Sequence, residues 1–277
     1  MSLSVLNNIP SLQAENQLEA TNSSLQKTLF RLSSGSRINS GADDAAGLAI
    51  ADGLQANISA LNQSASNAND GVGQLQVADG SLNQVTSLLN RAVTLATESA
   101  TGTVSSSQRT ALDAEFTSIK AEIDRIGSNT TFNGTSVFSA TTTSVFISDA
   151  GSSSSIGTTT GVLASNSIGG TNPTDLSGDD LTTASNAATA LTDINSAIAN
   201  VAALRGTIGA NINRLQSANT VITNQVQNLS AAEDQIRGAD IATEVGNLSK
   251  FQILNQTGIS ALAQANQSQQ GILKLLQ

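Results

Sequence analysis

Two adjacent carboxylates, Asp43 and Asp44, are the residues of this chain whose types and spacing come closest to a catalytic pair. Paired carboxylates act as general acid and general base when their surroundings separate their pKa values. The 277 residues include no His and no Cys, so imidazole bases, thiol nucleophiles, disulfides and most zinc or copper sites are excluded. We therefore interpret both acids as first-turn residues of a helix, capped by Ser40 or Asp43, and expect no enzyme activity, metal or cofactor.

A second chemical motif, Gly71-Val72-Gly73, has the glycine spacing of a nucleotide-binding loop. It lies inside a helical pattern and follows no predicted strand, so we reject that function. Each glycine inside a helix costs about 1 kcal/mol relative to Ala, and we expect close contact with another helix at Gly71, Gly73 and Gly80.

Composition and charge narrow the classes of partner. The net charge is −9 and the 12 Lys and Arg residues form no cluster along the chain, which argues against nucleic acid. The apolar runs are too short to span a membrane, so we expect no membrane partner. Residues 1–26 contain no basic residue and no continuous apolar stretch, which does not fit a cleaved secretory signal peptide.

Both ends of the chain carry a narrow apolar seam with steps of three and four residues, the spacing of a coiled coil. The seams are diluted with Asn, Ser, Ala and Gly, so a single helix of this kind buries too little to order alone. We predict that the ends pack with each other and with other copies. The seam positions are Leu18, Asn22, Leu25, Leu29 and Leu32, and then Phe251, Leu254, Gly258, Ala261, Ala265, Ser268, Ile272 and Leu275.

Three longer helices are predicted between these ends. Their seams cover about residues 54–95, 112–126 and 191–229, and Gly127 is expected to end the second helix. Residues 131–138 read as a β-hairpin with Asn133-Gly134 in a type I′ turn.

The middle of the chain, residues 139–185, has a different composition, since 21 of these 47 residues are Ser or Thr. Two alternatives remain open for it, a small β insertion or a flexible cap. The predicted fold is thus mainly α, a long antiparallel helical coiled-coil bundle formed by the N- and C-terminal segments, with one small hairpin and a short central insertion.

Several segments resemble bacterial flagellin. They are residues 32–51 (LSSGSRINSGADDAAGLAIA), 131–134 (TFNG), 228–245 (NLSAAEDQIRGADIATEV) and the ending 265–276. The similarity covers residues 1 to about 138 and about 188 to 277. It implies a terminal polymerisation domain (1–40 with 238–277), an inner helical domain with a hairpin (41–138 with 186–237) and a reduced outer region (139–185).

The resemblance also implies function, location and partners. The chain is expected to be a structural subunit that polymerises into the extracellular flagellar filament and is exported without a cleaved signal peptide. Expected partners are other copies of itself, an export chaperone at the C-terminal helix, the type III flagellar export apparatus, and the hook–filament junction and cap proteins.

A recognition site is implied as well. In the family, flagellin-sensing Toll-like receptors of animals grip an Arg, a Leu and a Glu, which match Arg91, Leu95 and Glu115 here. Val93 and Thr94 stand where basic and acidic residues are common in the family. The alternatives are an exposed ion pair for Arg91 and Glu115 and a core position for Leu95.

Two rival functions stay open. A hook–filament junction protein has similar termini. An adhesin or secreted surface-binding enzyme would place its activity in residues 139–185, although the absence of His and Cys gives an enzyme little to work with.

Overall fold

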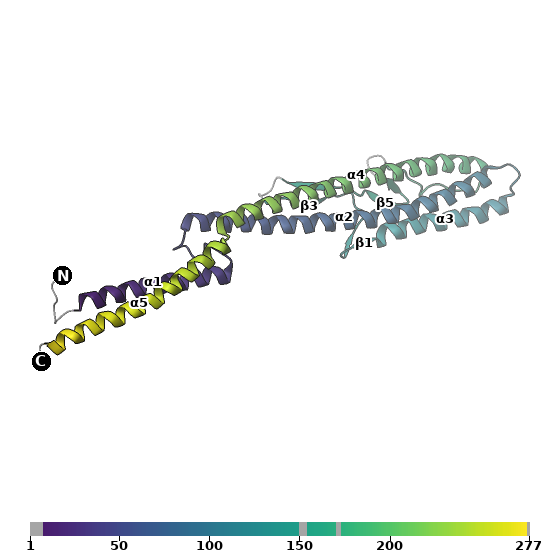
Figure 1. The fold of residues 1–277 in the computed structure, drawn as a ribbon. Helices are drawn as coiled ribbons and strands as arrows, with labels where there is room; N and C mark the ends of the chain where they lie inside the picture. The colour runs from purple at the N-terminus through teal and green to yellow at the C-terminus, as the bar shows by residue number, and fades with distance from the viewer. Residues whose placement is uncertain (1–7, 150–153, 170–172, 276–277) are drawn as a thin grey trace. The chain divides into compact units, whose positions relative to one another are not determined.

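Five long helices dominate the computed structural model, which describes residues 8–149, 154–169 and 173–275, with the side chains of the last helix described as far as Gly271 (Figure 1). This confirms the mainly α prediction. The helices are α1 (Ile9–Ser34), α2 (Ala45–Ala100), α3 (Ser106–Asn129), α4 (Ala184–Arg237) and α5 (Ile241–Leu275).

The chain divides into two compact units, and α2 and α4 contribute residues to both. The terminal unit comprises Met1–Ala56 with Asn228–Gln277, and the central unit comprises Asn57–Gln227. The predicted division into three domains stays a prediction.

The ends of α1 and the start of α2 follow from local side-chain chemistry. Asn8 caps α1 by accepting a hydrogen bond from the Ser11 backbone at 3.2 Å, and Pro10 lies in the first turn, where its missing N–H costs nothing. Gly35 ends α1 with a left-handed φ of 68°. The cap of α2 is Asp44, whose Oδ1 accepts from the Gly47 backbone at 2.9 Å, so the predicted caps Ser40 and Asp43 were wrong.

The central unit holds the hydrophobic core. The predicted seams meet here, since Leu75, Leu82 and Leu89 of α2 are fully buried together with Phe116 of α3 and Ile194 of α4. Alanines recur among the buried positions of α2 and α4, where their short side chains let helices approach closely. The start of α3 is fixed by a capping box between Ser105 and Gln108.

The predicted hairpin is confirmed as β1 (Thr131–Phe132) and β2 (Thr135–Ser136), which are antiparallel. Asn133 and Gly134 have φ of 49° and 76°, the pair of positive values that a type I′ turn requires.

Residues 139–185 form the β insertion rather than a cap without structure. β3 (Thr143–Phe146) pairs with β4 (Ser155–Thr158), and β5 (Val162–Ala164) pairs with β6 (Ser167–Gly169), each in antiparallel register. Alternate residues of these strands, such as Val145, Ile156 and Leu163, join the core of the central unit. Although the insertion is polar in composition, alternate apolar residues of its strands pack into the core and attach it to the helices.

Glycines mark where strands approach helices. A Cβ on Gly71 would come within 2.8 Å of Val145 Cγ2 on β3 and within 3.2 Å of Leu215 Cδ1 on α4, so the expected close contact with another helix is confirmed there. It was wrong for Gly73, whose nearest atoms belong to Phe132 of β1 at 3.5 Å, and for Gly80, which has no atom within 4 Å. Gly127 does not end α3, which continues to Asn129. It is buried beneath the backbone of β5, where an added Cβ would lie 1.7 Å from the Leu163 carbonyl oxygen.

Candidate assembly interface

Helices α1 and α5 lie side by side and run antiparallel in the terminal unit (Figure 1). Residue numbers rise along α1 as they fall along α5. Ser11 donates to Asn266 Oδ1 at 2.9 Å at one end, and Arg31 donates from Nη1 to Glu244 Oε1 at 3.2 Å at the other.

The α1–α5 seam is the series of buried or half-buried positions that follow one another in steps of three and four residues along each helix; Ser24, Arg31 and Asn247 are also half-buried and lie beside it. Its residues are mostly small or polar, so it buries far less apolar surface than a leucine seam would. The set is Ser11, Ala14, Leu18, Thr21, Leu25, Thr28 and Leu32 on α1, and Glu244, Leu248, Phe251, Asn255, Gly258, Leu262, Ala265 and Gln269 on α5.

The predicted seam and the α1–α5 seam share only part of their positions. Leu18, Leu25, Leu32, Phe251, Gly258 and Ala265 lie on both. Asn22, Leu29, Leu254, Ala261 and Ser268 lie outside the α1–α5 seam and are exposed in the single chain. The side chains of Ile272 and Leu275 lie outside the described residues. A role of any of these residues in polymerisation stays a prediction.

Threonines explain the shift between the two seams on α1. Thr21 and Thr28 are 5% and 4% exposed, whereas their neighbours Asn22 and Leu29 face outward. Thr21 satisfies its hydroxyl by donating to the Gln17 carbonyl at 2.8 Å, and its methyl group can then face the partner helix. A search for apolar residues alone passes over such threonines.

Exposed apolar side chains concentrate in the terminal unit. Ten of the thirteen large hydrophobic residues that are exposed in the described part of the chain belong to it, for example Phe30 at 61% and Ile253 at 67%. Among the described residues of this unit, the only buried hydrophobic residues are Ile38 and Ala51. The apolar side chains of this unit are therefore mostly exposed, whereas those of the central unit form a core.

A group of charges lies where α1, residues 35–44 and α5 meet. Lys27 Nζ lies 2.6 Å from Asp43 Oδ1, and this hydrogen bond lowers the pKa of the Asp43 carboxyl to about 2, helped by the Ser40 hydroxyl and the Asn39 backbone. Arg31 lies between Asp43, at 4.0 Å, and Glu244, at 3.2 Å. The adjacent acids of the sequence thus have structural roles, Asp43 as an ion-pair partner and Asp44 as a helix cap.

The breaks after α1 and after α4 lie against each other. Ser36 and Gly238 form an antiparallel bridge, in which the Arg37 N–H donates to the Arg237 carbonyl at 2.7 Å and the Ala239 N–H donates to the Gly35 carbonyl at 3.0 Å. Arg37 also donates from Nη2 to the Ile236 carbonyl at 2.7 Å, which satisfies an orphan acceptor at the end of α4.

The candidate receptor residues lie in the central unit. Arg91 and Glu115 form an exposed bidentate ion pair, at 2.7 and 3.1 Å, that joins α2 to α3. Leu95 is 1% exposed and belongs to the core. Its side chain therefore follows the core alternative, and recognition through Arg91 and Glu115 stays a prediction.

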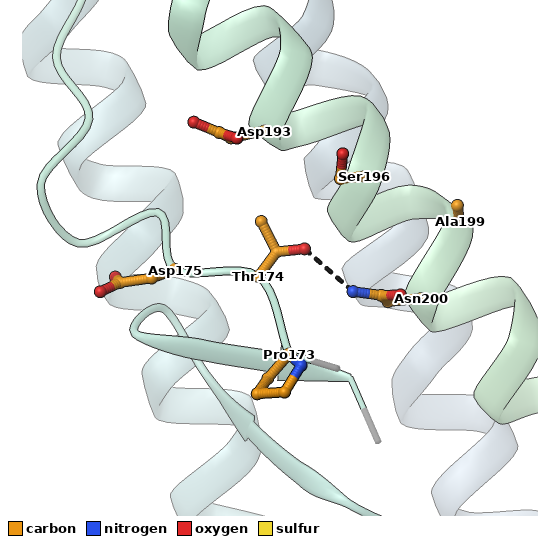
Figure 2. A pocket seen from close by; sticks show the side chains of 7 residues that line it. All are labelled: Pro173, Thr174, Asp175, Asp193, Ser196, Ala199 and Asn200. Atoms are coloured by element: carbon orange, nitrogen blue, oxygen red, sulfur yellow. Dashed lines mark hydrogen bonds between the residues drawn. The ribbon is translucent and has the colours of Figure 1, made fainter. Parts of the chain in front are cut away.

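Figure 2 shows an open, polar hollow between the Pro173–Asp175 segment and α4, where Asn200 Nδ2 donates to Thr174 Oγ1 at 2.9 Å. Asp175 and Asp193 border it, but the described residues contain no group of three or more acidic side chains that could hold a metal ion. None of the described helices is long and apolar enough to cross a membrane.

Comparisons with known proteins match both ends of the chain. The model of the bacterial flagellin N-terminal helical region matches residues 5–143, and that of the C-terminal helical region matches residues 191–276. The flagellin of Halalkalibacterium halodurans is 34% identical over 273 residues, covering 97% of this chain and 98% of that protein.

Further similarity is found to a second flagellin and to one solved structure. Flagellin FlaB2 of Treponema pallidum is 34% identical over 284 residues, with 97% of this chain and 98% of that protein covered. The crystal structure of Bacillus cereus flagellin matches with a TM-score of 0.49 at 28% identity, over 61% of this chain and 94% of that one.

Proposed function

Because the chain belongs to the bacterial flagellin family, a family of structural proteins of the flagellar filament, we propose that its terminal helices drive polymerisation of the filament by coupled folding and packing. The observation that carries the proposal is the concentration of exposed apolar residues in the terminal unit. In the described part of one chain these side chains are exposed, and neighbouring copies in a helical lattice would cover them.

The two units differ in a way that supports this mechanism. The central unit has a continuous core from Ala68 to Leu215 and can fold as one body. In the terminal unit, the α1–α5 seam buries Thr21, Thr28 and Glu244, which contribute little hydrophobic stabilisation. A helix pair with such a seam is marginal in isolation, so its ordering is coupled to association.

The same marginal stability suits export and control of assembly. Ends that order only in the lattice keep the monomer in a form that a narrow type III apparatus can export, with a chaperone on the C-terminal helix preventing early association. Assembly then takes place outside the cell, after the hook–filament junction and beneath the cap.

The proposal is tested by electron microscopy of the purified protein after addition of a precipitating salt, which strengthens burial of apolar surface. Long tubes of uniform width are expected. Protein that remains monomeric, even when seeded with filament fragments, would contradict the proposal and favour the hook–filament junction alternative.

A truncation separates the two units. A chain that lacks residues 241–277 loses α5, and we expect a soluble, folded central unit that forms no filament. Urea unfolding should remain about as cooperative as in the full chain, which would show that the central unit is folded. Microscopy under the same salt conditions shows whether filaments form. Filaments formed by this truncated chain would rule out polymerisation through the terminal helices.

A further inference from the structure

The seam side of α1 repeats itself after one heptad. Leucine and threonine alternate at steps of three and four along Leu18, Thr21, Leu25, Thr28 and Leu32, which we call the Leu–Thr repeat. Within this repeat, a seven-residue shift of α1 against α5 in one direction places leucine where leucine lay and threonine where threonine lay. Leu25 would replace Leu18 at Gly258, and Thr28 would replace Thr21 near Asn255.

The observed register rests on few specific contacts along most of the seam. The Asn22 and Asn255 side chains are hydrogen-bonded, as are Ser11 and Asn266, but both pairs are exposed. Exposed polar pairs exchange readily with water and contribute little net free energy. The apolar contacts of the Leu–Thr repeat alone do not distinguish the observed register from the one in which Leu25 lies at Gly258.

One contact does distinguish them. Glu244 is 7% exposed and its Oε1 accepts from Arg31 Nη1 at 3.2 Å. Asp43 lies 4.0 Å from the same guanidinium, and Asn247 donates to Glu244 Oε2 at 3.4 Å. After a shift of one heptad in one direction Arg31 would face the region of Phe251, and after a shift in the other Glu244 would face the region of Leu25. Either shift leaves a desolvated charge without its partner.

We propose that the Arg31–Glu244 ion pair selects the register in which α1 and α5 associate. The best-attested role of a buried polar or ionic group in a coiled coil is to fix register rather than to add stability. This choice of register is made within the terminal unit of one chain, and only its consequence for the filament rests on the proposed function. Subunits paired in a shifted register would present their exposed apolar residues at the wrong height in a lattice.

The backbone bridge between Ser36 and Gly238 lies close to this ion pair and also joins the two segments. Gly35 and Arg37 are exposed, so their backbone groups can bond to water if residues 35–41 rearrange. Glu244 is only 7% exposed in the observed pairing, so water replaces its partner less readily than it replaces the partners of the exposed backbone groups. For this reason we assign the choice of register to the ion pair and not to the bridge.

Disulfide trapping tests the register directly, because the chain has no Cys of its own. Cys replaces Asn255 in every variant. Asn22→Cys then reports the observed register, and Leu29→Cys or Glu15→Cys reports a shift of one heptad in either direction. All three α1 positions are exposed, so the Leu–Thr repeat stays intact. Cross-linking is measured on the full chain under assembly conditions, with microscopy of the same samples.

In the otherwise unchanged chain, we expect the 22–255 cross-link to exceed either shifted cross-link by on the order of a hundredfold, the scale set by an unpaired buried charge. The double substitution Arg31→Met with Glu244→Met keeps the bulk of both side chains and should reduce this preference to less than about tenfold. The single substitution Glu244→Gln should reduce it by an intermediate factor. Arg91→Met with Glu115→Met removes an exposed pair in the central unit and should leave it unchanged.

A Met double variant that keeps the full preference for the 22–255 cross-link would overturn the proposal. Loss of all three cross-links would overturn it as well, because the ion pair would then be required for pairing itself and not for the choice of register. Absence of filaments in the otherwise unchanged chain would count against the proposed function, and the cross-linking ratio would still be readable.

Discussion

Gly258 of α5 lies directly against Leu18 of α1, so that a Cβ added to the glycine would come within 3.1 Å of Leu18 Cδ1. This distance is shorter than ordinary van der Waals contact, so the leucine would have to move slightly to make room for a single methyl group. The glycine therefore sets how closely the two terminal helices approach, although it weakens α5 as an isolated helix.

Gly258→Leu is predicted to separate α1 from α5 and to destabilise their pairing by about 1–3 kcal/mol, the usual cost of overpacking. Gly246→Leu is the matched control on the same helix, because no atom lies within 4 Å of a Cβ there. The midpoint of thermal disassembly of filaments should fall for Gly258→Leu alone. Equal midpoints for both variants would show that the contact does not limit the pairing.

Heptad spacing was sufficient to predict that the two ends pair, but not which residues face each other. Asn22 and Leu29 fit the apolar template as well as Thr21 and Thr28 do, and burial of the threonines depends on the partner helix. The same holds for Asp44, whose role as the cap of α2 depends on where α2 begins. Such choices are decided by tertiary contacts that a local pattern does not contain.

The close approach of Gly127 to β5 yields a second prediction. Gly127→Ala would place a Cβ 1.7 Å from the Leu163 carbonyl oxygen, so β5 must move away from α3 and the central unit should lose roughly 2 kcal/mol or more of unfolding free energy. Gly80→Ala is the control, since its site is open and the helix should gain about 1 kcal/mol. Urea unfolding of the monomer measures both, and a stabilised Gly127→Ala protein would refute the packing.

Gly127 also shows why the central insertion was hard to predict. A glycine near the end of a helical pattern usually indicates a C-cap, and nothing local to residues 112–126 reveals that a strand passes over it. The apolar positions Val145, Ile156 and Leu163 lie in short apolar stretches of one to three residues with Ser, Thr and Gly between them, so an alternating pattern is weak in the sequence. Their role becomes clear only in the folded chain, where they pack in the same core as residues of α2 and α3.

Acid should weaken the terminal unit through Asp43. The folded pKa of about 2 lies below the ordinary Asp value of 3.8, so ionised Asp43 stabilises the folded form above pH 3.8, and this contribution is lost as the pH falls toward 2. Asp43→Asn should therefore flatten the pH dependence of filament disassembly between about pH 4 and pH 2. Lys27→Gln should have the same effect, because the Lys27 hydrogen bond is the largest cause of the lowered pKa. An unchanged acid profile in both variants would exclude this ion pair as a source of acid sensitivity.

Two phenylalanines separate folding from assembly. Phe116 is fully buried in the central unit beneath the Lys120 ammonium group, 4.9 Å from its ring centroid, whereas Phe30 is 61% exposed on α1. Phe116→Ala should destabilise the monomer by about 3–5 kcal/mol, the usual cost of removing a buried aromatic side chain. Phe30→Ala should leave the free energy of monomer unfolding within about 0.5 kcal/mol of that of the unchanged chain, since surface substitutions rarely do more.

Filament formation should depend on Phe30, because its exposed ring is surface that a neighbouring copy would cover. Phe30→Ala should then raise the protein concentration needed for filament formation, as measured by sedimentation. If Phe30→Ala assembles like the unchanged chain, its ring is not part of a contact between subunits.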